Sequence, residues 1–176
     1  MGAVSDIALL SWCAEFTLSH SEAVRERVHK ELEASAQTSL IMTLRTIRLQ
    51  GVVLAIGMLS LFESLLQAHL RWDRPFDQLD EYLKQHEKCE LAAKFNQYRL
   101  AVNVLKHGRG KSYERLLAMP GELEFKIKKP GESFFDEGEV SEIDTLIDVD
   151  DQLVRRCATL IQEIACFIRS KENVWI

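Results

Sequence analysis

The chain has 176 residues, 47% of them hydrophobic and 28% charged, which is ordinary for a globular protein and enough for one well-buried core. We therefore expect a single domain over residues 1–176. The four cysteines are widely spaced and form no C-x-x-C pair, which argues against a disulfide framework and a structural zinc site. Three of them (Cys13, Cys157 and Cys166) have apolar neighbours and are expected in the core.

The net charge of −5 is distributed unevenly along the sequence. Residues 130–154 contain nine Asp or Glu and no Lys, Arg or His, which leaves 22 basic against 18 acidic residues elsewhere. The basic excess is concentrated in residues 106–129, so an anionic ligand is compatible with the overall acidity. The acidic run over residues 132–151 lacks the ligand spacing of a calcium loop and is expected to be a solvated face.

Targeting and cofactor motifs give no positive signal. Asp6 stands where a myristoylation motif needs Ser or Thr, and the longest apolar run, residues 51–62, is too short to span a bilayer. The sequence contains no G-x-x-x-x-G-K-[ST], G-x-G-x-x-G, H-E-x-x-H or G-x-S-x-G motif. We expect a cytoplasmic protein with no metal, no cofactor and no membrane partner.

Helical periodicity dominates the first two thirds of the chain. Residues 5–6 can cap a first helix, and Ser19 or Ser21 offers a cap for a second one. Apolar residues then continue at helical spacing through residues 40–71. Within them, residues 52–66 are apolar on nearly every side, which predicts a central helix enclosed by others.

Glycine and proline mark the boundaries of later helices. Gly51 and Gly57 are expected to permit the close approach of a neighbouring helix. Pro75 suits the first turn of a new helix, and Gly108 suits the position that terminates the following one. A short helix is expected over residues 113–119.

The pattern then changes to a period of two. Residues 123–128 alternate strictly between apolar and polar, residues 133–135 could return as a second strand, and residues 145–149 could add a third. A last helix begins at residues 150–151. The predicted fold class is mainly α: an up-and-down helical bundle with a small β-hairpin or three-strand insertion at about residues 122–149 before the C-terminal helix.

One constellation has the composition of a site. Arg99, Asn103 and His107 are four residues apart, so they follow one face of a helix. A guanidinium, an amide and an imidazole together can bind a phosphate and transfer a proton. The competing interpretation is the solvated face of an amphipathic helix. The residues expected to bind a ligand beside this row are Lys106, Arg109, Lys111 and Ser112.

Glu63 is a further candidate, because it lies at the polar edge of the most apolar helix, where an isolated carboxylate is costly. It is either exposed at the end of the bundle or a partner for Arg99 or His107. The remaining histidines share the absence of metal-ligand spacing and are expected at the surface or an interface: His20, His29, His69 and His86.

Two segments resemble the HEPN superfamily: Leu61-Phe62-Glu63 on the central helix, and Asn103-Val104-Leu105-Lys106-His107-Gly108 at the end of a later helix. The resemblance spans most of the chain in outline, and about ten residues carry its specific part. It implies a helical bundle that is commonly dimeric. Many members are metal-independent ribonucleases of toxin–antitoxin and antiviral systems, and others are non-catalytic binding domains.

The active form of that family carries an arginine, usually with a polar neighbour such as asparagine, and a histidine four to six residues beyond the arginine. Asn103 and His107 match this motif, but Val102 precedes Asn103, and seven residues separate Arg99 from His107. The resemblance implies His107 as general base toward an RNA 2′-hydroxyl, Asn103 as an orienting group, and Arg99 with Lys106 or Arg109 as the phosphate clamp. Because the arginine is displaced, we expect feeble metal-independent ribonuclease activity or none.

The sequence therefore predicts a HEPN-like protein that binds a phosphate-bearing ligand, RNA being the first choice. The expected partners are a second copy of the chain, through helices near the site, and a cognate antitoxin or other protein. The alternative function is a non-catalytic dimerisation or protein-interaction module. A third interpretation gives the polar row a purely structural role.

Overall fold

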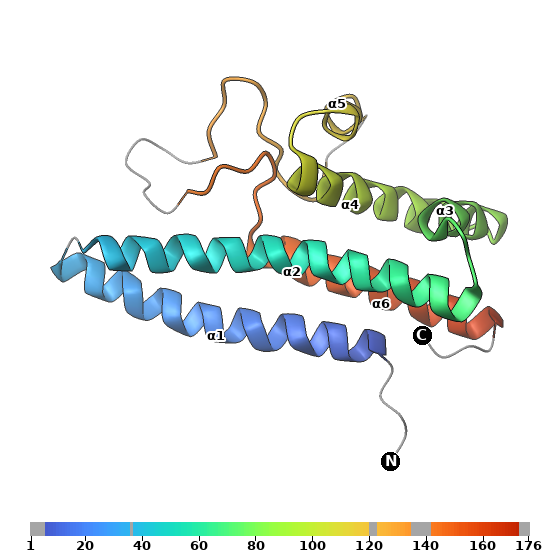
Figure 1. Ribbon diagram of the computed structural model, residues 1–176, viewed down its shortest axis with the longest axis horizontal. Helices are drawn as coiled ribbons and strands as arrows, with labels where there is room; N and C mark the ends of the chain where they lie inside the picture. Colours follow the sequence, from blue (N-terminus) through green and yellow to red (C-terminus); the bar gives the residue numbers. More distant parts are fainter. Residues whose placement is uncertain (1–5, 36, 120–122, 135–141, 173–176) are drawn as a thin grey trace, which may run out of the picture.

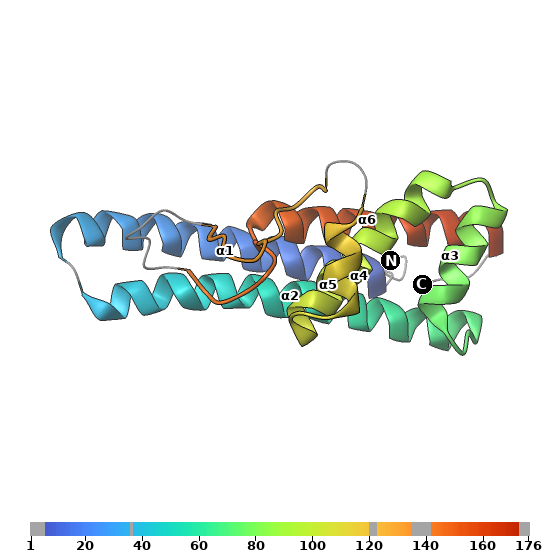
Figure 2. The ribbon, with the colours of Figure 1, turned by 90° about the horizontal axis from the view of Figure 1, so that it is seen from above.

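Figure 1 shows the computed structural model, which describes residues 6–35, 37–119, 123–134 and 142–172. The described residues form six helices: α1 (Asp6–Ala34), α2 (Thr38–Leu70), α3 (Pro75–Gln85), α4 (Cys89–His107), α5 (Lys111–Leu117) and α6 (Asp151–Glu172). They lie in three layers, with α1 below, α2 and α6 side by side in the middle, and α3, α4 and α5 above (Figures 1 and 2). The predicted helical bundle is confirmed.

The helix boundaries set by proline and glycine are confirmed. α2 ends where Arg71 adopts the left-handed conformation with φ 55°, and Pro75 occupies the first turn of α3. α4 ends at Gly108, which has φ 69° and donates its backbone N–H to the Val104 carbonyl at 2.8 Å. Proline and glycine set these helix ends through their own backbone conformation, so the ends could be predicted from the sequence without knowledge of tertiary contacts.

The predicted break in the first helical region is wrong, because α1 runs without interruption through Ser19 and Ser21. The Ser19 hydroxyl donates to Glu15 Oε1 at 3.4 Å, one turn earlier in the same helix. Ser21 is buried and donates to Gln50 Oε1 of α2 at 3.5 Å. Ser19 thus finds its partner within α1 and Ser21 finds one on α2, so neither hydroxyl ends the helix.

The main core lies between α2, α4 and α6, with α1 and α3 closing its sides. Phe62 and Phe95 are fully buried near its centre, with ring centroids 6.2 Å apart in an edge-to-face arrangement. The prediction that α2 is enclosed on nearly every side is only partly correct. Val53 is 62% exposed and Leu61 is 53% exposed, because α1 and α6 cover a limited arc of the helix.

The two glycines of α2 differ in their surroundings. A Cβ added at Gly51 would lie 3.3 Å from Val149 Cγ1, in the segment that leads into α6. The close approach predicted there is confirmed. Val154 of α6 and Val149, in the segment before α6, both lie within 4 Å of the added Cβ. Within the described residues, no other helix or segment comes within 4 Å of a Cβ added at Gly57, so the same prediction for Gly57 is wrong.

α2 is also longer than the apolar run that marks it in the sequence. Its 33 residues include an 18-residue window with a mean hydropathy of 1.8, of which a third is buried. By length and composition alone this helix is able to cross a membrane, which the run over residues 51–62 did not indicate. In the fold it packs against α1, α3, α4 and α6.

A second, smaller apolar cluster lies near the turn between α1 and α2. It consists of Val28, Leu40 and Leu44, with the half-buried Val24 and Leu32 packed against it. Both views show this end of the α1–α2 hairpin extending past the beginning of α6 (Figures 1 and 2). All of these described residues belong to the two helices of the hairpin.

The predicted β insertion is not formed in the described residues. The segments over 126–128 and 146–148 meet in an isolated antiparallel bridge between Ile127 and Ile147. Lys128 N donates to the Leu146 carbonyl at 2.8 Å, and Asp148 N donates to the Lys126 carbonyl at 3.1 Å. Residues 133–134 form no strand, and the rest of that predicted return strand lies outside the described residues.

The alternating pattern of residues 123–128 is explained by packing on a helix. Phe125 is buried against Tyr98 of α4, with ring centroids 5.7 Å apart. The Tyr98 hydroxyl donates to Glu124 Oε2 at 3.0 Å, and the Tyr113 hydroxyl donates to the Lys128 carbonyl at 2.7 Å. Side chains of α4 and α5 thus bury one face of the segment, and no sheet is needed to do so.

The prediction of core cysteines is correct for Cys157 alone. Cys157 is fully buried, and burial raises the pKa of its thiol to about 12. Cys13 and Cys166 are exposed on the outer faces of α1 and α6, and Cys89 is exposed at the start of α4. Apolar neighbours in sequence did not separate the inner face of a helix from the outer one.

Candidate functional site

Four of the predicted site residues line one pocket of about 420 Å³, where α2, α3 and α4 meet. Glu63 comes from α2, and Arg99, Asn103 and Lys106 come from successive turns of α4. Asn103 is half-buried and Lys106 is exposed. The helix spacing therefore brings together the guanidinium, the amide and one of the basic side chains expected to bind a ligand.

Arg99 has a fixed partner in this pocket. Its side chain is 23% exposed, and its Nη1 lies 2.9 Å from Asp77 Oδ1 of α3. Arg74 approaches the other oxygen of the same carboxylate at 3.7 Å. Glu63 is exposed and forms no ion pair with Arg99 in the described structure, so Asp77 takes the part that Glu63 was expected to play.

Opposite charges are balanced around the pocket. Its carboxylates are Glu63, Asp73 and Asp77, and its cations are Arg74, Arg99 and Lys106. A pocket of this kind attracts a phosphate less strongly than the sequence row alone indicated, because Arg99 already faces a carboxylate at hydrogen-bonding distance. Polar groups of both signs suit a ligand that offers donors as well as acceptors.

His107 does not line this pocket. It is the last residue of α4 and is exposed. Each residue turns an α-helix by about 100°, so the eight steps from Arg99 to His107 rotate the side chain about 80° away from the pocket. Two residues four apart differ by about 40° around the helix axis and share one face, but residues eight apart differ by about 80° and do not.

The loop after α4 and the helix turns beside it carry four exposed cations within ten residues of sequence, with the exposed Glu114 among them. Lys106, Arg109, Lys111 and Arg115 are all exposed, and in the described parts of the chain none of them forms an ion pair. Ser112, in the first turn of α5, is half-buried. Arg115 was missed in the sequence, although its position four residues after Lys111 on a short helix signals it.

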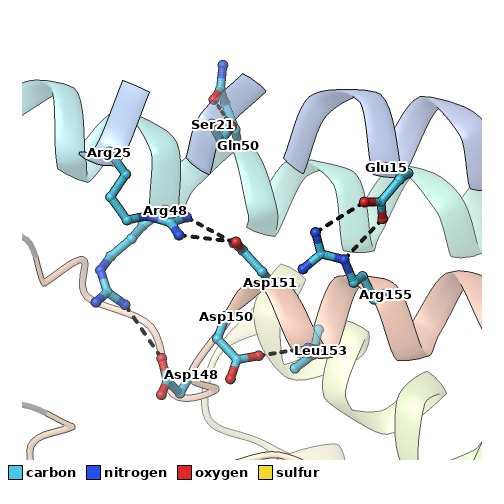
Figure 3. A network of polar contacts seen from close by, with 10 residues as sticks. All are labelled: Glu15, Ser21, Arg25, Arg48, Gln50, Asp148, Asp150, Asp151, Leu153 and Arg155. Carbon is cyan, nitrogen blue, oxygen red and sulfur yellow. Dashed lines mark hydrogen bonds and ion pairs between the residues drawn. The ribbon is translucent and has the colours of Figure 1, made fainter. Parts of the chain in front are cut away.

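A second pocket, of about 360 Å³, lies between α1, α2 and the segment that leads into α6. Arg25 of α1 binds Asp151 of α6 through two contacts of 2.9 and 3.1 Å, and Arg48 of α2 lies 3.6 Å from Asp148 (Figure 3). Because both guanidinium groups face aspartates, the network ties three elements together and does not offer a free anion site.

This network corrects only in part the expectation that residues 132–151 are a solvated face. Asp148 and Asp151 are half-buried, whereas Glu132, Asp144 and Asp150 are exposed, and residues 135–141 lie outside the described residues. Asp150 Oδ1 accepts the Leu153 backbone N–H at 2.7 Å and so caps α6 (Figure 3). Burial raises the pKa of Asp148 above its usual range, and the nearby Arg48 opposes that shift only partly. Glu142 accepts a hydrogen bond from Lys128 Nζ at 2.8 Å. Aspartates that look solvated in sequence thus hold the end of the insertion and the start of α6.

Metal ligation finds no support in the described ranges, since no group of three His, Cys, Asp or Glu side chains there is placed to hold an ion. No family model, no curated protein and no solved structure matches the chain. The resemblance to the HEPN superfamily therefore rests on the residues that carry it, and function is argued from geometry.

Proposed function

We propose that this protein binds RNA through the α4–α5 basic surface, defined as Lys106, Arg109, Lys111 and Arg115. The observation that carries the proposal is that these exposed cations have no carboxylate partner in the described structure. Unpaired lysines and arginines on one surface are what a phosphate backbone requires, because binding releases its condensed counterions. The acidic residues counted in the net charge lie mostly elsewhere.

The neighbouring pocket supports the proposal. Lys106 belongs both to the basic surface and to the pocket lined by Arg99 and Asn103. A phosphate held at Lys106 places the adjoining nucleotide beside the Asn103 amide, which can donate to and accept from a base edge. Balanced charge is no obstacle there, because a base and a ribose are neutral.

Catalysis is the weaker part of the proposal. His107 is exposed beside the basic surface, whereas Arg99 faces the pocket and is held by Asp77. A general base and a phosphate clamp must act on the same phosphate, and these two side chains point to different sides of α4. We therefore expect RNA binding with feeble metal-independent cleavage or none.

Binding is tested by fluorescence anisotropy with a labelled single-stranded RNA over a range of salt concentrations. Each lost phosphate contact reduces the slope of log K against log salt by about 0.7, so Arg109→Ala with Lys111→Ala should reduce it by about 1.4. The matched control is Lys30→Ala with Arg45→Ala, which removes the same charge from exposed positions near the α1–α2 turn. Equal slopes for the wild type and the first variant would refute the assignment of this surface.

Cleavage is tested with the same RNA in EDTA. Any cleavage by the proposed mechanism leaves 2′,3′-cyclic ends, disappears in His107→Ala and falls on the order of 10²-fold in Arg99→Ala. Cleavage that requires a divalent metal, or that survives in His107→Ala, would exclude the mechanism while leaving the binding proposal intact.

A second candidate function is a non-catalytic dimerisation or protein-interaction module. Large exposed apolar side chains on α1 and α2 favour it, with either a second copy or another protein, such as a cognate antitoxin, as the partner. They are Leu9, Trp12, Phe16, Met42, Leu49, Val53 and Leu61. Loss of salt-dependent RNA binding in every assay would favour this function over the first.

A further inference from the structure

The pocket between α2, α3 and α4 has polar side chains that are free to bind a ligand. Glu63 of α2 is exposed and Asn103 of α4 is half-buried, and neither side chain forms a hydrogen bond or an ion pair within the described residues. By contrast, Asp77 and Arg99 already bind each other at 2.9 Å. The pocket, about 420 Å³ in volume, therefore offers a carboxylate and an amide to a ligand.

Hydrogen-bond donors and acceptors reach this pocket from different helices. Arg99, Asn103 and Lys106 all belong to α4. Arg99 binds Asp77 through Nη1, which leaves other N–H groups of its guanidinium to donate. Glu63 belongs to α2 and contributes two acceptor oxygens. A ligand that fits both helices presents acceptors toward α4 and a pair of donors toward α2.

We propose that this pocket selects guanine among the bases of the RNA bound by the α4–α5 basic surface, a proposal that rests on that RNA binding. The Glu63 carboxylate accepts hydrogen bonds from guanine N1–H and N2–H₂, and Asn103 and Arg99 donate to O6 and N7. Lys106 holds a phosphate of the same nucleotide at the mouth that the pocket shares with the basic surface.

Guanine is the standard RNA base with two adjacent donors on one edge. Its N1–H and N2–H₂ groups point the same way and match the two oxygens of one carboxylate. Adenine and cytosine each place an amino group beside a ring nitrogen that accepts, and uracil places N3–H between two carbonyl oxygens. Those acceptors would face the negative charge of Glu63, so the carboxylate attracts guanine and disfavours the other three bases.

Phe76 of α3 gives the pocket an aromatic side chain. It is half-buried, and its ring centroid lies 5.0 Å from that of Phe95 and 6.4 Å from that of Phe62. Because the two core rings hold Phe76 in place, it loses little freedom when a base packs on it. Aromatic side chains stack on every base with little preference. Phe76 therefore supplies affinity, and Glu63 supplies the choice of base.

The test compares guanosine with inosine, which keeps O6, N7 and N1–H but lacks the N2 amino group. Fluorescence anisotropy measures the binding of two labelled uridine-rich RNAs that differ only in one central G or I. We expect the wild type to bind the G-containing RNA about tenfold more tightly, toward the low end for a base contact because Glu63 is exposed. Backbone contacts are the same in both RNAs, so they cancel in this ratio.

Three variants locate the contact. Glu63→Ala should bring the ratio of the two affinities close to one. Asn103→Ala should weaken both RNAs alike, since both bases keep the acceptors that face α4. Glu81→Ala is the matched control, because it removes a carboxylate from an exposed position of α3 outside the pocket, and it should keep the tenfold ratio. Circular dichroism verifies that each variant is folded.

The outcomes separate this proposal from RNA binding itself. Equal affinities of the wild type for the two RNAs would refute the guanine pocket and leave the basic surface intact. A preference for G that survives in Glu63→Ala would refute the assignment to Glu63. If no RNA binds, the nuclear magnetic resonance signal of the Asn103 amide is followed with guanosine monophosphate and inosine monophosphate. A response to the first at lower concentration supports the pocket alone, and equal responses refute both proposals.

Discussion

Two arginine pairs join α1 to α6, and their difference in burial predicts a difference in their contributions to stability. Arg25 binds Asp151, and Arg155 binds Glu15, each through two nitrogen–oxygen contacts of 2.9–3.2 Å. The arginine side chains are almost equally exposed, at 35% and 33%. The carboxylates differ, since Asp151 is 22% exposed and Glu15 is 57% exposed.

The magnitudes follow from that difference. A hydrogen-bonded charge pair that is partly shielded from water contributes about 1–2 kcal/mol, whereas an exposed pair contributes about 0.2–1 kcal/mol. Arg25→Ala also leaves Asp151 with fewer partners in a sheltered place, although the α6 N-terminus offsets part of that cost. We expect Arg25→Ala to cost about 1.5 kcal/mol and Arg155→Ala about 0.5 kcal/mol.

Urea unfolding followed by circular dichroism measures both costs. With a slope of about 2 kcal/mol per molar urea, Arg25→Ala should lower the midpoint by about 0.75 M and Arg155→Ala by about 0.25 M. Double-mutant cycles with Asp151→Ala and Glu15→Ala isolate the two pair energies. Equal pair energies, or a larger one for the exposed pair, would refute the argument from burial.

Two further predictions concern packing and pH. Gly57→Ala should raise the free energy of unfolding by about 0.7 kcal/mol through helix propensity. Gly51→Ala should lack that gain, because its Cβ meets Val149 at 3.3 Å. Thermal unfolding that finds Gly51→Ala more stable than Gly57→Ala would contradict the packing described. The Lys128 ammonium lowers the pKa of Glu142 below its unperturbed 4.5, so its contribution to stability is complete above about pH 5 and lost as pH falls through the lowered pKa. Urea midpoints measured from about pH 6 to pH 3 should therefore fall less in Glu142→Gln than in the wild type.

Sequence patterns predicted those features that depend on neighbours along the chain. Pro75 and Gly108 mark helix ends because their backbones act locally. Ser19 and Ser21 did not, since a serine ends a helix or rests within it according to what lies beside it in space. The alternation around Phe125 was read as a strand, but α4 supplied the apolar surface that a sheet would have given.

The candidate site was predictable to the same extent. One helical step correctly brought Arg99 and Asn103 to a common pocket, together with Glu63 from another helix. His107, eight residues after Arg99, lies outside the pocket, because the rotation around the helix axis adds up over two intervals of four residues. The partner of Arg99 is Asp77, 22 residues earlier on a separate helix, and no spacing rule connects such a pair.

The small cluster near the α1–α2 turn gives the molecule two levels of cooperativity. Among the described residues, Val28, Leu40 and Leu44 form a cluster separate from the main core, and side chains of α1 and α2 make it up. We expect that end to open and close again at a lower free energy than the helices around Phe62, as a separate folding unit. We therefore expect native-state fluctuation to be graded along α1 and α2: greatest at their turn and least where α6 packs against both helices.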